Sequence, residues 1–400
     1  MSADVADEGR MVTQHTEIAI IGGGVIGSAV AFFLRELGYD GTVTVFEKDP
    51  SYQFASTARS AASIRQQFTT TVSTQMSQFS YGFLESLPER FGDDGDIGMF
   101  RGGYLLVADA ARADALRACH KTFVSLGSDI AWLDAPDLAQ RFPWLNTEDL
   151  VGATLGLSGE GWFDAYMLLR ILRREARKLG VVYCDQEVTG IDVAGDRVTA
   201  VRTASGAVWS CAMAVNAAGP AGGQVAALAG CELPVEPRKR TMFVIQAPLS
   251  NKGMPFIFDS TGVAIRPEGD RFICSAPPDP ENDPHPGDDF EPDFNLFEDK
   301  VWPALAHRIP ALEELRMVSA WAGHYEMNLL DHNGVVGPHP DLANFLFATG
   351  FSGHGVMHSP ATGRGIAEWI LNGRYTSLDL SPLGYDRIRT GTPIREALVY

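Results

Sequence analysis

The chain has 400 residues, of which 45% are hydrophobic and 20% charged, and its formal net charge is −18. One hydrophobic core seldom supports a chain of this length, so we expect two domains in an ordinary globular protein. The strong negative charge argues against nucleic acid or an anionic membrane surface as a partner. Any anionic ligand must therefore be held by arginines placed locally around its site.

The five cysteines contain no C-x-x-C pair, so they indicate neither a disulfide framework nor a metal site. No apolar run approaches the roughly 20 residues of a membrane span. Residues 1–15 lack the apolar centre of a signal peptide. We therefore expect a flexible leader on a cytoplasmic protein that binds no metal.

The first predicted elements form a nucleotide-binding pattern. Residues 17–21 are typical of a buried strand, residues 25–37 of an apolar helix and residues 42–46 of a second strand. The turn between the first strand and the helix reads Gly22-Gly23-Gly24-Val25-Ile26-Gly27, which fits G-x-G-x-x-G. Glu47 ends the second strand, where an acid accepts hydrogen bonds from a ribose. The whole unit predicts a dinucleotide whose pyrophosphate lies at the helix N-terminus.

The following elements alternate between helices and strands. Residues 51–68 are rich in small and hydroxylated side chains, residues 71–87 and 110–126 are predicted helices, and a strand lies between these helices at 101–109. Asp164 is a plausible N-cap for an amphipathic helix that ends at Gly180. A β-meander is predicted after this helix, as far as Pro220, followed by alternating strands over 234–320 with a hairpin at 267–270.

Two later segments bear on function. Residues 277–293 contain six prolines and seven acids, which is typical of a solvated loop, with a mobile cover over a site as the alternative. Residues 344–371 repeat the order of strand, glycine-rich loop and helix. An extended FAD needs such a second loop and a minimal NAD domain lacks it, so the sequence favours FAD over NAD.

Four blocks in this order resemble the family of D-amino acid oxidase and sarcosine oxidase. They are the unit ending at Glu47, "STARSAASIR" (56–65), "VNAAGP" (215–220) and "GFSGHGVMHSPATG" (350–363). Within that family, "WAGHYEM" and "GFSGHGVMHSP" look most like the sarcosine oxidase β-subunit and proline dehydrogenase branch. The resemblance implies an α/β plus α+β fold, in which a Rossmann-like FAD-binding domain of the glutathione reductase type is interleaved with a mixed antiparallel substrate domain.

The domain boundaries follow from the same resemblance. The FAD-binding domain is predicted over 16–105, 155–233 and 320–400, and the substrate domain over 106–154 and 234–319. Motif and resemblance together predict these cofactor-binding residues: Gly22, Gly24, Val25, Ile26, Gly27, Glu47, Lys48, Ser56, Arg59, Ser60, Ala61, Val188, Ala218, Gly219, Gly323, Gly350, Ser352, Gly353, His354, Gly355, Val356 and Met357.

The chain departs from the family at positions that matter for chemistry. Gly323 stands where monomeric sarcosine oxidases carry the cysteine that attaches flavin, so we predict non-covalent FAD. The family's familiar carboxylate anchors are replaced here by Phe68, Met357 and Tyr325. Arg65 is the best remaining cation for a substrate carboxylate, because an arginine fork suits that group. Arg266 follows, and Arg240 is a weaker candidate.

Other catalytic candidates surround the predicted flavin loop. His354 can hydrogen-bond cofactor or substrate, Tyr325 can orient an amine, and Glu326 can attract an ammonium group or instead pair with an arginine. The segment 271–276 contains no lysine, whereas sarcosine oxidases use one there to promote reaction with O₂. The electron acceptor, O₂ or another molecule, is therefore open.

The resemblance implies hydride transfer from the carbon beside an amine to FAD, followed by hydrolysis of the imine. The favoured substrate class is a secondary amino acid such as sarcosine, dimethylglycine or iminodiacetate, with an oxidase favoured over a dehydrogenase. Alternatives are a D-amino acid, glycine or proline-type enzyme, a non-catalytic FAD-binding assembly protein and an NAD-dependent dehydrogenase. The oligomeric state does not follow from the sequence.

Overall fold

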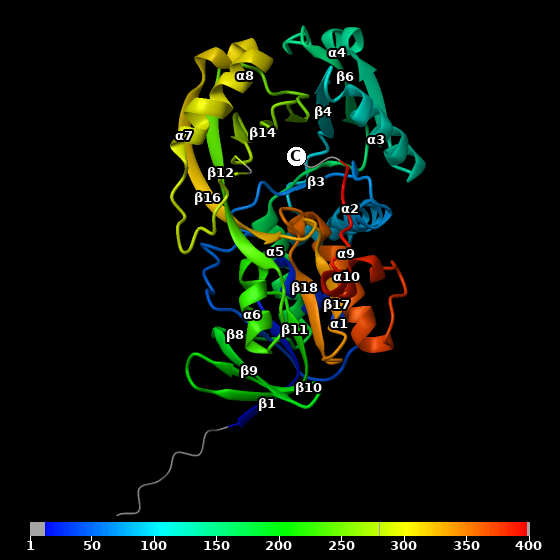
Figure 1. Cartoon of the computed structure of the whole chain (residues 1–400), viewed down its shortest axis with the longest axis vertical. Coiled ribbons are helices and arrows are strands. Elements are labelled where there is room, and N and C mark those ends of the chain that lie inside the picture. Colours follow the sequence, from blue (N-terminus) through cyan, green and yellow to red (C-terminus); the bar gives the residue numbers. More distant parts are fainter. Residues whose placement is uncertain (1–12, 280, 398–400) are drawn as a thin grey trace, which may run out of the picture.

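The structure is a computed structural model that describes residues 13–279 and 281–397. Two eight-stranded sheets organise these residues, one in the lower body of the molecule in Figure 1 and one in its upper part. Most of the predicted leader lies outside the described residues, but residues 13–15 already belong to the first strand. The prediction that they are part of a flexible leader is therefore wrong, because they pair in register with residues 208–210.

The first sheet has the order β17-β18-β11-β1-β2-β8, and β10 and β9 extend it antiparallel from β11. Its strands are β1 Thr13–Ile21, β2 Val43–Phe46, β8 Val182–Cys184, β9 Val188–Ala194, β10 Arg197–Thr203, β11 Val208–Asn216, β17 Val335–Pro338 and β18 Phe345–Thr349. The centre is parallel, as a doubly wound nucleotide-binding sheet requires.

Side chains of β1 alternate between two hydrophobic cores, as the pleat of a strand requires. Ile18 and Ile20 pack with four helices on one face: α1 Val25–Glu36, α2 Thr71–Phe91, α5 Ala165–Lys178 and α9 Gly355–Asn372. Ala19 and Ile21 pack on the other face with α6 Gly222–Leu228 and the β9–β10 hairpin. Both faces are therefore covered, which explains the almost continuous apolar run of this strand.

The second sheet has the order β16-β12-β15-β14-β13-β4-β6-β5. Its strands are β4 Tyr104–Asp109, β5 Ile130–Asp134, β6 Leu150–Gly156, β12 Val235–Gln246, β13 Phe256–Phe258, β14 Ala264–Glu268, β15 Arg271–Ser275 and β16 Arg316–Asn328. All neighbours are antiparallel except β13 and β4. The division into two domains at the boundaries given above stays a prediction, since strands of this sheet come from 104–156 and 235–328.

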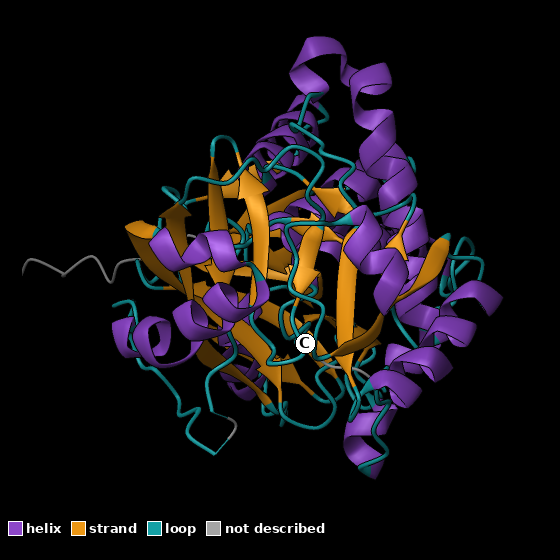
Figure 2. Ribbon diagram, turned by 90° about the horizontal axis from the view of Figure 1, so that it is seen from above, coloured by secondary structure: helices purple, strands orange, loops and turns teal. Residues whose placement is uncertain are grey.

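Shorter elements complete the fold. They are the strand pair β3 Ser63–Ile64 and β7 Gly161–Trp162, helices α3 Ala113–Ser125, α4 Ala135–Arg141, α7 Phe294–Leu296, α8 Trp302–Arg308 and α10 Asp386–Thr390, the 3₁₀ turns Gly92–Gly95, Gly219–Ala221, Pro310–Glu314 and Ser381–Leu383, and the π-helical turn Phe297–Val301. Helices α3, α4, α7 and α8 lie with the second sheet, whereas α10 lies beside α9 in the lower body (Figures 1 and 2). No helix within residues 13–279 and 281–397 is long and apolar enough to cross a membrane.

Several local predictions are confirmed. The Asp164 side chain caps α5 by accepting hydrogen bonds from the amides of Tyr166 and Met167 at 2.8 and 3.0 Å. The predicted hairpin is formed by β14 and β15. The long strands β12 and β16 pair along their whole length and run from the second sheet toward the first (Figure 1). They thereby bring residues 323–326 to the edge of the first sheet.

Candidate cofactor site and surrounding residues

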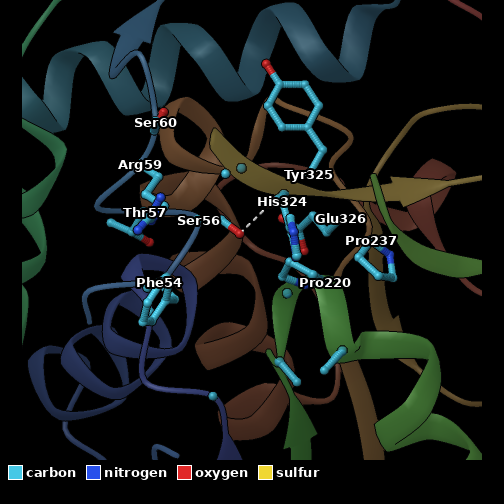
Figure 3. A pocket seen from close by; sticks show the side chains of 18 of the residues that line it. Phe54, Ser56, Thr57, Arg59, Ser60, Pro220, Pro237, His324, Tyr325 and Glu326 are labelled. Atoms are coloured by element: carbon cyan, nitrogen blue, oxygen red, sulfur yellow. Dashed lines mark hydrogen bonds between the residues drawn. The ribbon is translucent and has the colours of Figure 1, made fainter. Parts of the chain in front are cut away.

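A cavity of about 1180 Å³ lies between the carboxyl ends of the first sheet and the strands β12 and β16 (Figure 3). Its volume exceeds the roughly 300–1,000 Å³ usual for small-molecule sites, which suits a dinucleotide. Sixteen predicted cofactor residues line it: Gly22, Gly24, Val25, Ile26, Glu47, Lys48, Ser56, Arg59, Ser60, Ala61, Ala218, Gly219, Gly323, Gly353, Gly355 and Val356.

The first glycine turn is a cradle with no room for side chains. Gly22 has φ +102°, and a Cβ there would lie 2.3 Å from the carbonyl oxygen of Ala217. A Cβ on Gly27 would lie 1.9 Å from the Gly22 carbonyl oxygen. Gly27 does not line the cavity, because its role is to let α1 pack against β1, as the motif predicts.

The N-terminus of α1 is suited to an anion. Gly24 provides no side-chain cap, and the first turn contains no acid, so the partial positive charge of the helix is not neutralised locally. Thr57 Oγ1 accepts a hydrogen bond from the amide of Val25 at 3.2 Å. Glu47 lies beside this turn and accepts from the amide of Gly23 at 2.8 Å. Burial raises the pKa of Glu47 above its usual range, while hydrogen bonds from Asp49 and Gly23 oppose that shift.

The second glycine-rich loop closes the opposite end of the cavity. Gly353 has φ +101°, and a Cβ there would lie 2.5 Å from the ring of Tyr325. Helix α9 begins at Gly355 without a side-chain cap, so a second helix N-terminus faces the site. Tyr325 points away from Phe54, Ser56 and Pro220 in Figure 3. Its residue is 38% exposed and lines the cavity.

Glu326 is buried beside the same loop. Its Oε2 accepts hydrogen bonds from Thr349 Oγ1 and the amide of Gly350, both at 2.9 Å. Burial raises its pKa to about 7, and these hydrogen bonds limit the rise. No arginine pairs with Glu326 among the described residues, so the alternative of an arginine partner is wrong. A carboxyl group that is partly protonated near neutral pH lines the cavity instead.

Arg65 and His354 form one polar group outside the cavity lining. Arg65 is 5% exposed; its Nη1 donates to the Gln67 carbonyl at 2.9 Å and its Nη2 to His354 Nε2 at 3.2 Å. Its guanidinium lies 4.2 Å from the centroid of the Phe68 ring. Burial, followed by the charge of Arg65, lowers the pKa of His354 well below its usual range. His354 is therefore neutral, and its Nε2 accepts a hydrogen bond from the Arg65 guanidinium.

Arg65 has no carboxylate within salt-bridge distance among the residues that the structure describes. A buried guanidinium is normally paired with an acid. Arg65 therefore forms no structural salt bridge within the described part of the chain. A substrate carboxylate would supply the missing partner.

Arg266 is buried on β14 and is already engaged. It pairs with Glu268, donates to the Pro267 carbonyl at 2.8 Å and donates to the Ala61 carbonyl, also at 2.8 Å. It thus links the second sheet to residues 56–65, which we call the serine-rich loop, and does not line the cavity. Its Nε has no hydrogen-bond partner among the described residues. The catalytic role of Arg266 stays a prediction.

The acidic segment packs over the cavity. We call residues 281–293 the acidic strap. Its residue Phe290 stacks on His324 with ring centroids 4.0 Å apart, and Arg59 lies 5.0 Å from the centroid of the same Phe290 ring. Strap residues His285 and 287–291 line the cavity. This arrangement favours the alternative of a cover over a site.

Five more predicted cofactor residues lie outside the cavity lining, in addition to Gly27. Gly350 binds Glu326, the Ser352 hydroxyl accepts from the Asn328 amide at 2.9 Å, and Met357 is buried in the core of the first sheet. Val188 is buried in β9, where it pairs with Thr203, and His354 binds Arg65. Their roles toward the cofactor stay predictions.

Sequence reasoning missed two features of this region. Arg240, a weak candidate, lines the cavity and forms a fork with Asp283. Glu160 is fully buried and accepts hydrogen bonds from the Gln66 amide at 2.8 Å and the Tyr104 amide at 3.0 Å. Neither the contact of Arg240 nor those of Glu160 can be recognised as a sequence motif, because the contacting residues are more than 40 positions apart in the chain.

The residues present fit an FAD. Two glycine loops, two helix N-termini without a side-chain bond from the N-cap residue, and the ribose-directed acid Glu47 surround a cavity large enough for a dinucleotide. Four of the five cysteines are buried, Cys184 is partly buried, and none lines the cavity. Fold and site define an FAD-binding oxidoreductase.

Comparison with known proteins agrees with this class. Residues 17–369 match the DAO family, described as FAD dependent oxidoreductase, and the chain belongs to this family. It is 38% identical to "FAD-dependent oxidoreductase domain-containing protein 1" of Bos taurus, over 98% of this chain and 88% of that protein. It is 27% identical to the glycine oxidase of Geobacillus kaustophilus, over 94% of this chain and 98% of that one.

Solved structures confirm the fold. The L-proline dehydrogenase of P. horikoshii superposes with a TM-score of 0.85 at 24% identity and covers 96% of this chain and 100% of its own. At this identity, the likeness concerns the fold alone. The protein is thus an FAD-binding flavoprotein related to enzymes that act on amino acids, with the interleaved architecture that the sequence predicts.

Proposed function

We propose that the protein oxidises the C–N bond of a secondary amino acid, such as sarcosine, dimethylglycine or iminodiacetate. Bound FAD supplies the acceptor for a hydride and its two electrons. The substrate loses the hydride from the carbon beside its amine and becomes an imine, which water converts to a carbonyl compound and a smaller amine. The relatives named glycine oxidase and sarcosine dehydrogenase support this reaction class.

The single observation that carries the proposal is the buried guanidinium of Arg65, which has no acid partner among the described residues. A neutral His354 accepts a hydrogen bond from the guanidinium, and the Phe68 ring supports it from the side. The fork therefore has a fixed orientation, and the buried Glu160 acts on its charge without forming an ion pair with it. A substrate carboxylate held there would be positioned by a preorganised group.

Tyr325 and Glu326 are adjacent on β16 and complete the proposed site. Successive residues of a strand point to opposite faces, so the phenol and the carboxyl group are directed differently. Tyr325 is 38% exposed and lines the cavity, whereas Glu326 is buried against the second glycine loop. We assign the phenol to orientation of the substrate amine and the carboxyl group to the cofactor side of the cavity.

We favour an oxidase, although strand β15, Arg271–Ser275, contains no lysine. The five cysteines are free, which supports a reducing compartment such as the cytoplasm. The test is to mix the purified holoprotein anaerobically with N-substituted glycines, D-amino acids, glycine and proline while following the visible absorbance of the flavin. Bleaching by an N-substituted glycine, followed by recovery in air, is the expected result. Bleaching by D-amino acids or proline alone would overturn the proposed substrate class.

A further inference from the structure

Arg240 on β12 is held by a carboxylate that belongs to the acidic strap. Its Nη1 and Nη2 donate to Asp283 Oδ1 and Oδ2 at 2.9 and 2.8 Å. This two-bond fork is the geometry in which arginine binds any planar carboxylate. The side chains of Arg240 and Asp283 are 15% and 20% exposed, so the pair lies at the edge of the cavity and is not sealed in a core.

The surroundings of Arg240 are those of the proposed substrate site. Its guanidinium lies 5.2 Å from the centroid of the Tyr325 ring. Desolvation raises the pKa of the Tyr325 phenol, and the charges of Arg240 and then Arg65 oppose that shift. The guanidinium of Arg240 therefore lies beside the phenol, and the charge of Arg65 also acts on it. The two arginines come from different elements, β12 and the loop of residues 56–65.

The two arginines differ in how their charge is balanced. Arg65 has no acid partner among the described residues, whereas the acid partner of Arg240 comes from a loop. The acidic strap has other attachments: Asp289 pairs with Lys239, and its carbonyl accepts from His324 Nε2 at 2.7 Å. Asp283 can therefore leave Arg240 while Asp289 and Phe290 keep the strap in place.

We propose that Arg240 binds a second carboxylate of the substrate and that Asp283 occupies this position until the substrate arrives. The inference rests on the proposed function and narrows its substrate class to secondary amines that carry two carboxylates. Arg65 takes one carboxylate, Arg240 takes the other, and the amine lies between them beside Tyr325. A substrate with one carboxylate would leave the fork of Arg240 and Asp283 intact.

Two ethers test this assignment without any turnover. Methoxyacetate has the shape of sarcosine and diglycolate that of iminodiacetate, but an ether oxygen replaces the amine, so neither can be oxidised as an amine. Both are titrated into holoprotein, and binding is followed by flavin absorbance and by calorimetry. Because no reaction occurs, the titration is informative even if no amine bleaches the flavin.

Substitutions of Asp283 and of Arg240 should change the Kd of diglycolate in opposite directions. Asp283→Asn removes the competing charge, so the Kd of diglycolate falls about fivefold or more while that of methoxyacetate changes less than about twofold. Arg240→Gln raises the Kd of diglycolate about tenfold or more, toward that of methoxyacetate. In the double variant, Asp283→Asn no longer improves binding.

Lys239→Gln is the matched control, because it breaks the neighbouring attachment of the strap while the backbone carbonyl of residue 239 can still accept from Arg240 Nη1. It leaves the Kd of both ethers unchanged if Asp283 competes directly. If Lys239→Gln and Asp283→Asn increased the affinity for diglycolate equally, opening of the strap would explain the increase, and the assignment would be overturned. Two further results would overturn the assignment. In one, Asp283→Asn changes the Kd of both ethers by the same factor; in the other, that variant does not bind diglycolate.

Discussion

The guanidinium of Arg65 donates a hydrogen bond to His354 Nε2 over 3.2 Å and so joins two segments that are 289 residues apart in the chain. One segment is the serine-rich loop and the other is the N-terminus of α9. Because arginine can only donate, the imidazole must be neutral, with its proton on Nδ1. This contact fixes the direction of a buried cation at the edge of the cofactor site, and the first prediction concerns it.

Arg65→Gln should lower kcat/KM for carboxylate-bearing amines about 10- to 100-fold, since a charged hydrogen bond to the substrate is lost. Arg65→Lys should restore only a small part of the lost kcat/KM, because lysine lacks the planar, two-pronged guanidinium of arginine. Steady-state kinetics measures the change and the flavin spectrum shows that FAD is retained. Arg101→Gln is the control, since Arg101 makes an exposed ion pair with Glu85; an equal loss in both variants would contradict the role of Arg65.

Alanine in place of a helical glycine should weaken FAD binding at Gly27 and stabilise the fold at Gly82. In Gly27→Ala the new Cβ meets the Gly22 carbonyl oxygen at 1.9 Å, so α1 must move away from the cofactor cradle and FAD affinity should fall at least about tenfold. In Gly82→Ala, on α2, nothing lies within 4 Å. Alanine is the better helix former there, and the free energy of unfolding should rise by about 0.5–1 kcal/mol.

FAD content after gel filtration and urea unfolding measure these two variants. A Gly27→Ala protein that keeps its full FAD content would show that the close approach at Gly22 is not needed for the cofactor. A destabilised Gly82→Ala protein would show that α2 is under a constraint that the structure does not contain.

Glu326 should make stability depend on pH. Its pKa is raised from 4.5 to about 7, chiefly by burial, so the folded state holds a proton that the unfolded state has already released in this range. The contribution of Glu326 to the free energy of unfolding is therefore fully present below about pH 4.5. It is lost as the pH rises toward 7, by an amount of order 1–3 kcal/mol. Glu326→Gln, which resembles the protonated form, should reduce this decline.

Urea unfolding of holoprotein at about pH 5 and about pH 8 checks the effect. The quantity compared is the difference in unfolding free energy between the two pH values, in the wild type and in Glu326→Gln. Glu160, whose pKa burial also raises to about 7, titrates in the same range and remains in both proteins. Identical differences in the two proteins would contradict the assignment to Glu326.

The flavin should be bound without a covalent link through cysteine. Gly323 lies at the position of the family's attachment cysteine, a Cβ there would be only 2.9 Å from Arg59 Cβ, and none of the five cysteines lines the cavity. Acid precipitation should therefore leave the yellow colour in the supernatant. Colour that stays with the precipitated protein would contradict the prediction.

The sequence by itself determined the elements whose causes are local. The glycine turn of residues 22–27, the Asp164 cap and the second glycine loop each depend on a few adjacent residues, because φ preferences and capping act over short distances. Continuous apolar runs likewise indicated buried strands of the first sheet, and alternating residues over 234–320 indicated strands of the second. The family resemblance then supplied the order in which these pieces are interleaved and the identity of the cofactor.

Only the tertiary structure decided how the charges are paired. The acid that holds Arg240 is 43 residues away, the donor Thr349 that binds Glu326 is 23 residues away, and Arg266 donates to a carbonyl 205 residues away. No local pattern encodes such contacts, because they arise when β12 and β16 bring the second sheet to the cofactor cavity. Which arginine is paired with an acid, and which has only neutral acceptors among the described residues, follows from that packing.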